Sequence, residues 1–217
     1  MIKKYSEFLN EGILQHLTGP SDEQILNNLI DKYQNMDKLL DKSIDMEFYD
    51  GVKYALENDA NANATDGFNR NFLYFVCKDE DIDILKLLIK YGINIHFDRD
   101  YALRTAAENK QEKVLKLLIK NGADVNAVEG EALRSACNMG NYEIAKILVD
   151  NNADIHVRDE RPLKNAASVA YYKIIKMLLE HGADVTKIQE HAFKRMEDCK
   201  RFDCLDLINE YKNKVKS

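Results

Sequence analysis

The chain has 217 residues, of which 45% are hydrophobic and 31% are charged, and its formal net charge is −6. This composition is typical of a globular protein with a continuous core, and the lack of a long apolar run or a signal peptide argues against a membrane span and against secretion. The negative charge disfavours a nucleic-acid partner and an anionic membrane surface, because both would repel the chain.

Residues 1–20 do not share the pattern of the repeats that follow, and we interpret them as an N-terminal extension with a targeting or docking role. Four apolar residues of this segment would share one face of a helix: Ile2, Tyr5, Phe8 and Leu9. The run KYSEFLNE at residues 4–11 resembles the targeting segment at the start of internal head proteins in contractile-tailed bacteriophages. The head protease of those phages cuts after an apolar-x-Glu triplet before a small residue, so the resemblance implies a processing site at Leu9, Glu11 and Gly12. A simple docking helix or a frayed helix is the alternative.

A helix is predicted to begin after Ser21, at the start of a domain that we place at residues 21–211. Ser21 and Gln24 have the spacing of a capping box, in which each side chain accepts a hydrogen bond from the backbone N–H of the other residue. The apolar face of a terminal repeat needs a cover. We therefore expect this helix to cap the first repeat.

A unit of 30 residues recurs through the rest of this domain. The sequence Gly-Ala-Asp-Val at residues 122–125 returns as Asn-Ala-Asp-Ile at 152–155 and as Gly-Ala-Asp-Val at 182–185. One apolar position has the same period, with Leu73, Leu103, Leu133, Leu163 and Phe193. We place six units at about residues 36–65, 66–96, 97–126, 127–156, 157–186 and 187–211, followed by a basic C-terminal tail at 212–217.

Each unit contains the pattern of two short amphipathic helices. In the third unit, the apolar residues of 101–109 and of 112–120 recur at helical spacing. Gly122 then ends the second helix, because glycine tolerates the left-handed backbone conformation. One helix pair of this size cannot bury its apolar faces alone, whereas stacked pairs can. The predicted fold is an all-α solenoid of about six helix-pair repeats with short loops and an N-terminal capping helix.

These units resemble the ankyrin repeat. The resemblance rests on Gly-Ala-Asp-Val-Asn at residues 122–126, on Ala-Leu-x-x-Ala in the first helix and on Val-x-Lys-Leu-Leu in the second, and it covers about four fifths of the chain. It implies a stack of helix pairs that binds partner proteins, and compact repeats of this kind are also similar to those encoded by large DNA viruses. The family's Thr-Pro-Leu-His start of the first helix is replaced by sequences such as YALR at residues 101–104, and the preceding loop is three residues shorter. We therefore expect a tight acidic loop in place of the projecting hairpin, and a flatter recognition surface.

An acidic residue precedes a basic residue by three or four positions at the start of four first helices. The pairs are Asp100 and Arg104, Glu131 and Arg134, Glu160 and Lys164, and Glu190 and Lys194. Residues at this spacing are neighbours on a helix surface. We predict local ion pairs within each unit.

The sequence contains no catalytic or metal-binding motif, so we predict no enzymatic activity, no metal and no cofactor. His96 and His156 occupy the same turn position two units apart, and we interpret them as periodic turn residues. Cys77 and Cys137 are also two units apart, which is beyond disulfide reach, and we expect both thiols in the core. This cysteine usage favours a reducing intracellular compartment, the cytoplasm.

The predicted function is protein binding by a monomer, through the concave face of the stack. We expect the partner to contact loop and first-helix positions that differ from unit to unit, because specificity is grafted onto a constant scaffold. The candidate residues are Arg99, Tyr101, Glu108, Glu129, Glu131, Asn138, Asp159, Arg161, Ser168, Gln189 and His191. The alternative is a structural or packaged virion protein that uses residues 1–11 as its address.

Overall fold

The computed structural model describes residues 21–65, 70–79 and 81–216, which fall into two compact units divided between Ile95 and His96. Secondary structure in the described residues is helical, apart from one isolated antiparallel bridge between Thr65 and Asn71. The all-α class predicted from the sequence is confirmed. The N-terminal extension, with its proposed processing site at Leu9, Glu11 and Gly12, lies outside the described residues.

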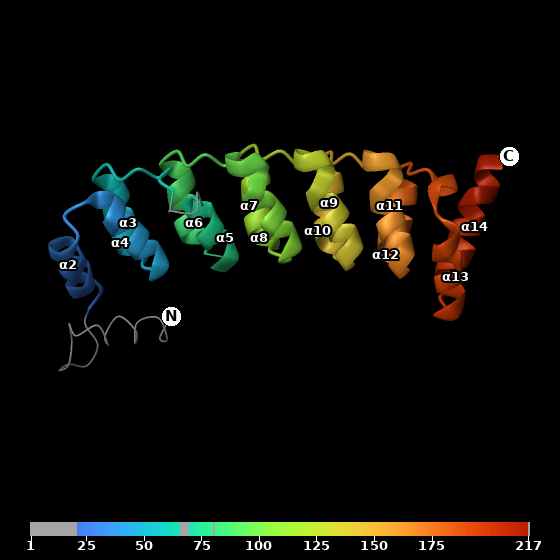
Figure 1. Ribbon diagram of the computed structural model, residues 1–217, viewed down its shortest axis with the longest axis horizontal. Helices are drawn as coiled ribbons and strands as arrows, with labels where there is room; N and C mark the ends of the chain where they lie inside the picture. The colour runs from blue at the N-terminus through green and yellow to red at the C-terminus, as the bar shows by residue number, and fades with distance from the viewer. Residues whose placement is uncertain (1–20, 66–69, 80, 217) are drawn as a thin grey trace. The chain divides into compact units, whose positions relative to one another are not determined.

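The first unit contains the capping helix and two helix pairs. Its helices are α2 (Asp22–Lys32), α3 (Met36–Asp45), α4 (Tyr49–Glu57), α5 (Phe72–Asp79) and α6 (Ile82–Lys90) (Figure 1). The first helices of the two pairs, α3 and α5, contact each other, and so do the second helices, α4 and α6. The unit is therefore built from two layers of helices with the apolar faces between them.

The predicted capping box is present at the start of α2. The Gln24 backbone N–H donates to Ser21 Oγ at 3.3 Å, and the Ser21 N–H donates to Gln24 Oε1 at 3.0 Å. Ile25 and Leu29 are buried on one face of this helix, and α2 contacts α4. The sequence-based prediction that this helix covers the first helix pair is confirmed.

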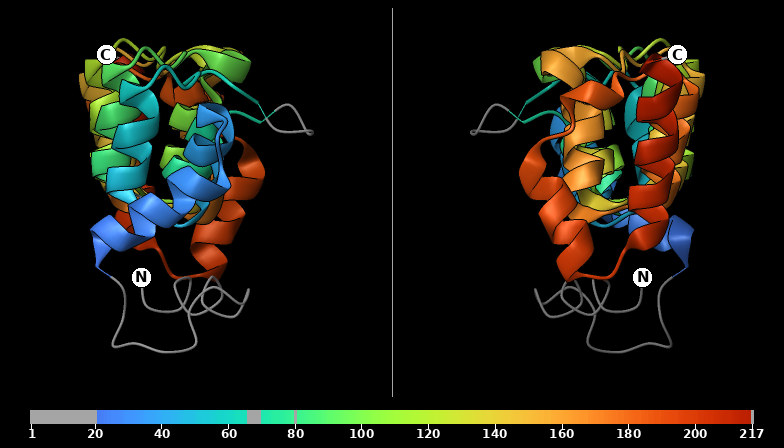
Figure 2. Two further views of the ribbon diagram at one scale, coloured as in Figure 1. Left: turned by 90° about the vertical axis from the view of Figure 1, so that its left-hand side faces the viewer. Right: turned by 90° about the vertical axis from the view of Figure 1, so that its right-hand side faces the viewer.

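The second unit contains four helix pairs that follow one another in sequence (Figure 1). Its elements are α7 (Phe97–Glu108), α8 (Glu112–Lys120), α9 (Ala127–Met139), α10 (Tyr142–Asp150), α11 (Val157–Val169), α12 (Tyr172–Glu180), η2 (Val185–Lys187), α13 (Glu190–Asp198) and α14 (Phe202–Lys216). Helix α9 contacts α7 and α11, and α11 contacts α13; in the other layer, α10 contacts α8 and α12, and α12 contacts α14. The end view on the right of Figure 2 shows α13 in one layer and α14 in the other.

The core of the second unit follows the period of the sequence. Leu103, Leu133 and Leu163 are at most 1% exposed, and each is followed three residues later by a fully buried alanine that lets neighbouring helices approach closely. Cys137 is fully buried in the same layer, and Cys77 is fully buried in the first unit, as predicted. Burial raises the pKa of the Cys77 thiol to about 12 and raises the pKa of Cys137 further, so both are inert core side chains.

The first helices α7, α9 and α11 each begin with one left-handed turn. Asp98, Arg99 and Asp100 have φ of 47°, 54° and 57°, and the corresponding three residues of α9 and of α11 have φ between 50° and 65°. The right-handed helix starts only at the next residue, so the expected tight loop is confirmed in an unexpected form. A left-handed conformation costs about 1–2 kcal/mol for each residue with a side chain. Other contacts must therefore hold these turns in place.

The third residue of each left-handed turn is buried. At Gly130 a side chain would meet Val157, with a Cβ only 3.2 Å from Val157 Cγ2. In the other two turns this position holds Asp100 and Glu160, which are 4% and 5% exposed. The buried position of the turn thus holds either a glycine beneath an apolar side chain of the next repeat or a buried acid.

Candidate partner-binding surface

The predicted binding residues that are described lie on the outward side of the first-helix layer. Arg99, Glu129 and Asp159 are the exposed second residues of the left-handed turns. The others lie on or beside the first helices: Glu108, Asn138, Arg161, Gln189 and His191 are exposed, and Tyr101, Glu131 and Ser168 are half-buried. We call this surface of α7, α9, α11 and α13, with their preceding turns, the first-helix face.

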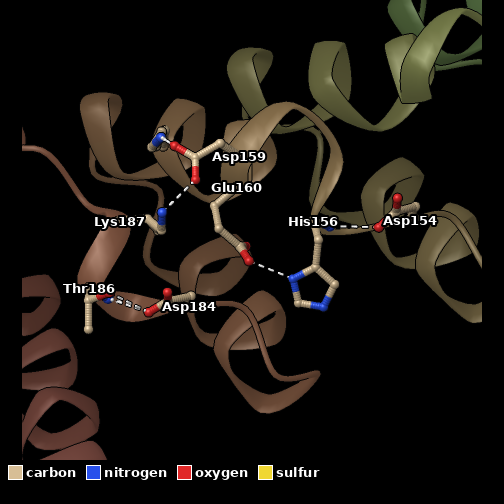
Figure 3. Close-up of polar contacts among 8 residues, drawn as sticks. Asp154, His156, Asp159, Glu160, Asp184, Thr186 and Lys187 are labelled. Atoms are coloured by element: carbon tan, nitrogen blue, oxygen red, sulfur yellow. Dashed lines mark hydrogen bonds and ion pairs between the residues drawn. The ribbon is translucent and has the colours of Figure 1, made fainter.

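Ion pairs on the first-helix face run between neighbouring repeats. Arg104 Nη1 lies 2.6 Å from Glu131 Oε2 in the next repeat, and Arg158 pairs with Glu129 of the repeat before it. Asp159 binds Lys164 Nζ at 2.6 Å within its own repeat and Lys187 Nζ at 2.8 Å in the following one (Figure 3). These two lysines lower the pKa of Asp159 to about 2. Ion pairs thus connect adjacent repeats on this face.

None of the four predicted local ion pairs forms among the described residues, and the two acids Asp100 and Glu160 have other partners. Asp100 Oδ1 instead lies 3.0 Å from His96 Nδ1 and accepts a hydrogen bond from the Asp124 backbone N–H at 3.0 Å. Glu160 Oε1 lies 2.5 Å from His156 Nδ1 (Figure 3). The reason is the left-handed turn: both acids belong to it, so they do not share a right-handed helix face with the base and their side chains are buried.

His96 and His156 therefore have a more specific role than that of periodic turn residues. Where the turn has asparagine, as at Asn126, the side chain reaches the next repeat directly. It accepts a hydrogen bond from the Asp154 N–H at 2.7 Å and donates one to the Asn152 carbonyl at 3.2 Å. Where the turn has histidine, the ring instead binds the buried acid four residues later. In the sequence, a histidine at the asparagine position together with an acid four residues later indicates such a buried pair.

We expect stability to depend on pH through the His156–Glu160 pair. The hydrogen bond to Glu160 raises the pKa of His156 above its ordinary value of 6.5, and Glu160, Asp154 and Asp184 raise it further by charge, against the effect of desolvation. Because the folded-state pKa is the higher one, this stabilisation is fully present below about pH 6.5 and is lost as the pH rises through the raised pKa. Urea titrations across this range should show the decline.

The matched control for this pH dependence is His156→Asn, which places at this turn the residue that the preceding repeat has at Asn126. We expect the variant to lose the part of the pH dependence that is due to His156, while its helix content stays the same. An unchanged pH profile of the unfolding free energy in the variant would contradict the assignment.

Three guanidinium groups lie near one another where α9 meets α11. Arg134 donates hydrogen bonds to the backbone carbonyls of Glu129 at 3.0 Å and Val128 at 3.3 Å. Desolvation and the positive charge of Arg158 lower the pKa of Arg134, Glu131 and Glu129 raise it, and Arg161 lowers it to a smaller extent. Three bases and two acids therefore influence one another at this point of the first-helix face.

Other kinds of site were sought within residues 21–65, 70–79 and 81–216. No group of three or more His, Cys, Asp or Glu side chains in these ranges is arranged to hold a metal ion. No helix in them is long and apolar enough to cross a membrane. The four cysteines of the chain are free, and only Cys199 is exposed.

Comparison with known families identifies the repeat. The family model described as ankyrin repeats (3 copies) matches residues 42–129 and 128–189, which together are about two thirds of the chain. A comparison with curated proteins gave no match. The matched span runs from within α3 to the turn before α13, so it includes every left-handed turn described above. The chain belongs to the ankyrin repeat family.

Proposed function

We propose that this protein is a non-enzymatic module that binds a partner protein on its first-helix face, the surface expected to be concave in a stack of ankyrin repeats. Ankyrin repeats are in general protein-interaction modules. The observation that supports the proposal is a contrast within each repeat. The outward position at the start of the right-handed helix holds Tyr101, Glu131, Arg161 and His191 in turn, whereas the buried position two residues later is leucine in the first three of these repeats. A constant core beneath a variable surface is what specific binding requires.

A steric block tests this assignment without changing any charge on the first-helix face. Asn138→Trp and Ser168→Trp place a large side chain on that face, at the ends of α9 and α11. Lys113→Trp and Glu143→Trp are the matched controls, because both residues are exposed on the second helices α8 and α10. With each protein immobilised as bait, we expect the first two variants to lose the partner captured by the natural protein, and the controls to retain it. Retention by all four would contradict the proposal.

Three further parts of the proposal concern the state and surroundings of the protein. We propose an intracellular, cytoplasmic protein, which the free thiols support, since thiols persist in reducing compartments. We also propose that it acts as a monomer and binds no nucleic acid. The net charge of −6 and the carboxylates between the bases of the first-helix face support the latter, because both oppose the approach of phosphates.

A second candidate function is that of a structural or packaged virion protein. It is supported by the sequence at residues 4–11, which is similar to the targeting segment of phage internal head proteins, and by the compact repeats. Mass spectrometry of the mature protein tests it. A mature N-terminus at Gly12 would support packaging and cleavage after Glu11, whereas an intact Met1 in purified particles would contradict the cleavage.

A further inference from the structure

Arg161 is an exposed cation without a counter-ion, whereas three other bases of the first-helix face have one. Arg104 and Arg158 pair with Glu131 and Glu129, and Lys164 pairs with Asp159. The Arg161 side chain makes no ion pair or hydrogen bond within the described part of the chain, and its charge is one of the smaller causes that lower the pKa of Arg134. The ion pairs of this face thus leave an excess of positive charge around Arg161.

The excess continues into the next repeat. His191, Lys194 and Arg195 lie on α13, which contacts α11, and all three are exposed. None of the three forms an ion pair with any residue that the structure describes. We call these residues the basic patch, together with the guanidinium groups beside them: Arg134, Arg158, Arg161, His191, Lys194 and Arg195.

We infer that the basic patch docks an acidic, extended segment of the partner protein, through aspartate or glutamate side chains that pair with Arg161 and with the bases of α13. This inference rests on the proposed function of the first-helix face and adds the chemistry of the partner. Guanidinium groups bind carboxylates through paired, charge-assisted hydrogen bonds. The surface already holds a carboxylate against a guanidinium group twice, through one hydrogen bond each, at Arg104 with Glu131 and at Arg158 with Glu129. A carboxylate from the partner would continue that series at Arg161.

The distance between neighbouring repeats predicts the spacing of the acidic residues in the partner segment. Helices packed side by side are about 8–10 Å apart, and an extended chain advances by about 3.3–3.4 Å per residue. An acidic residue at every third position would therefore meet the bases of successive repeats. A nucleic acid fits less well, because Glu129, Asp159 and Glu190 lie between the bases and would repel its continuous row of phosphates.

Direct binding of a defined peptide tests the inference. The probe is a fluorescent 12-residue peptide in which Glu-Ser-Thr occurs four times, followed by fluorescence anisotropy with the full chain. Two comparison probes are a peptide of the same composition with its four glutamates in one block, and a single-stranded oligonucleotide with a similar number of charges. We expect the spaced peptide to bind most tightly and its affinity to fall as salt is added, since exposed charges are screened. Tighter binding of the oligonucleotide, or no binding of the spaced peptide, would overturn the inference.

Two charge-reversal variants test where on the protein the peptide binds. Arg161→Glu should weaken binding of the spaced peptide by about tenfold or more, because it turns an attractive contact into a repulsive one. Lys113→Glu makes the same change of charge at an exposed site on α8 and should have little effect. Equal losses for the two variants would overturn the assignment to the basic patch.

Capture of the partner separates this inference from the proposed function. If Arg161→Glu retains the partner while Asn138→Trp loses it, the first-helix face binds a partner but not through an acidic segment. If both variants retain the partner, the proposed function fails as well. Loss of the partner by both variants, with circular dichroism unchanged, is the result that we expect.

Discussion

Replacing Leu133 with alanine should lower the free energy of unfolding by about 2–5 kcal/mol. The Leu133 side chain is fully buried, and its helix, α9, contacts both α7 and α11. The cavity left by the substitution would lie beside two neighbouring helix pairs, and stacked repeats depend on the contacts between neighbours for much of their stability. Urea titrations followed by circular dichroism would measure the loss.

Leu117→Ala is the matched control, because it removes the same atoms from a leucine that is only half-buried. We expect this variant to lose clearly less free energy of unfolding than Leu133→Ala, since less apolar surface is returned to water. Equal costs for the two variants would contradict the role of Leu133 as a core residue between helix pairs.

Replacing Gly140 with alanine should lower the free energy of unfolding by roughly 2–5 kcal/mol, for two separate reasons. Gly140 ends α9 in the left-handed conformation, with φ of 74°, and a side chain in that conformation costs about 1–2 kcal/mol. A Cβ at this position would also lie 2.6 Å from ring atoms of Tyr171 in the next repeat. The equivalent residues Lys110 and Ala170 have similar positive φ of 61° and 62°, so the position accepts a side chain where no ring covers it.

Two further variants separate the two causes. Gly122→Ala introduces a side chain at φ of 96° with no other atom within 4 Å, so it measures the backbone cost alone. Tyr171→Asn removes the ring and leaves the residue that the preceding repeat has at Asn141. In that background Gly140→Ala should cost only about 1–2 kcal/mol. The same cost with and without the ring would show that packing against Tyr171 does not explain the glycine.

The helices and the cap could be predicted from the sequence because their causes are local. The period of 30 residues identifies the helix pairs, and Leu103, Leu133 and Leu163 are buried as that period indicates. The capping box at Ser21 and Gln24 requires only that two side chains reach each other's backbone. Features that repeat in the sequence and satisfy their own hydrogen bonds are visible without a structure.

The left-handed turns could not be predicted, because they contradict the conformational preferences of their residues. Val128 is β-branched, a type that rarely adopts positive φ, yet its φ is 53°. Only Gly130 among the nine residues of the three turns prefers this region. What stabilises the turn is contact with residues that are distant in the sequence, for example Asp100 with the Asp124 backbone N–H. Such contacts depend on the fold and not on the local sequence.

The same turns decide which charges remain on the candidate surface. The spacing in the sequence predicts ion pairs of Asp100 and Glu160 with bases on the same helix face, but both acids are buried beside histidines. Arg104 and Lys164 pair instead with Glu131 and Asp159, and neither of these acids is then available to Arg161, which is exposed. The set of candidate residues follows from periodicity, whereas the charge that a partner meets follows from the backbone of the turns.

Site-specific photo-crosslinking tests the central claim most directly, that the first-helix face is where the partner binds. A benzophenone amino acid placed at Asn138 or Ser168 would report contacts on that face, and the same group at Lys113 or Glu143 would report contacts on the second helices. We predict that the partner is crosslinked from Asn138 and Ser168 but not from Lys113 or Glu143. Crosslinks from the second helices alone would contradict the account.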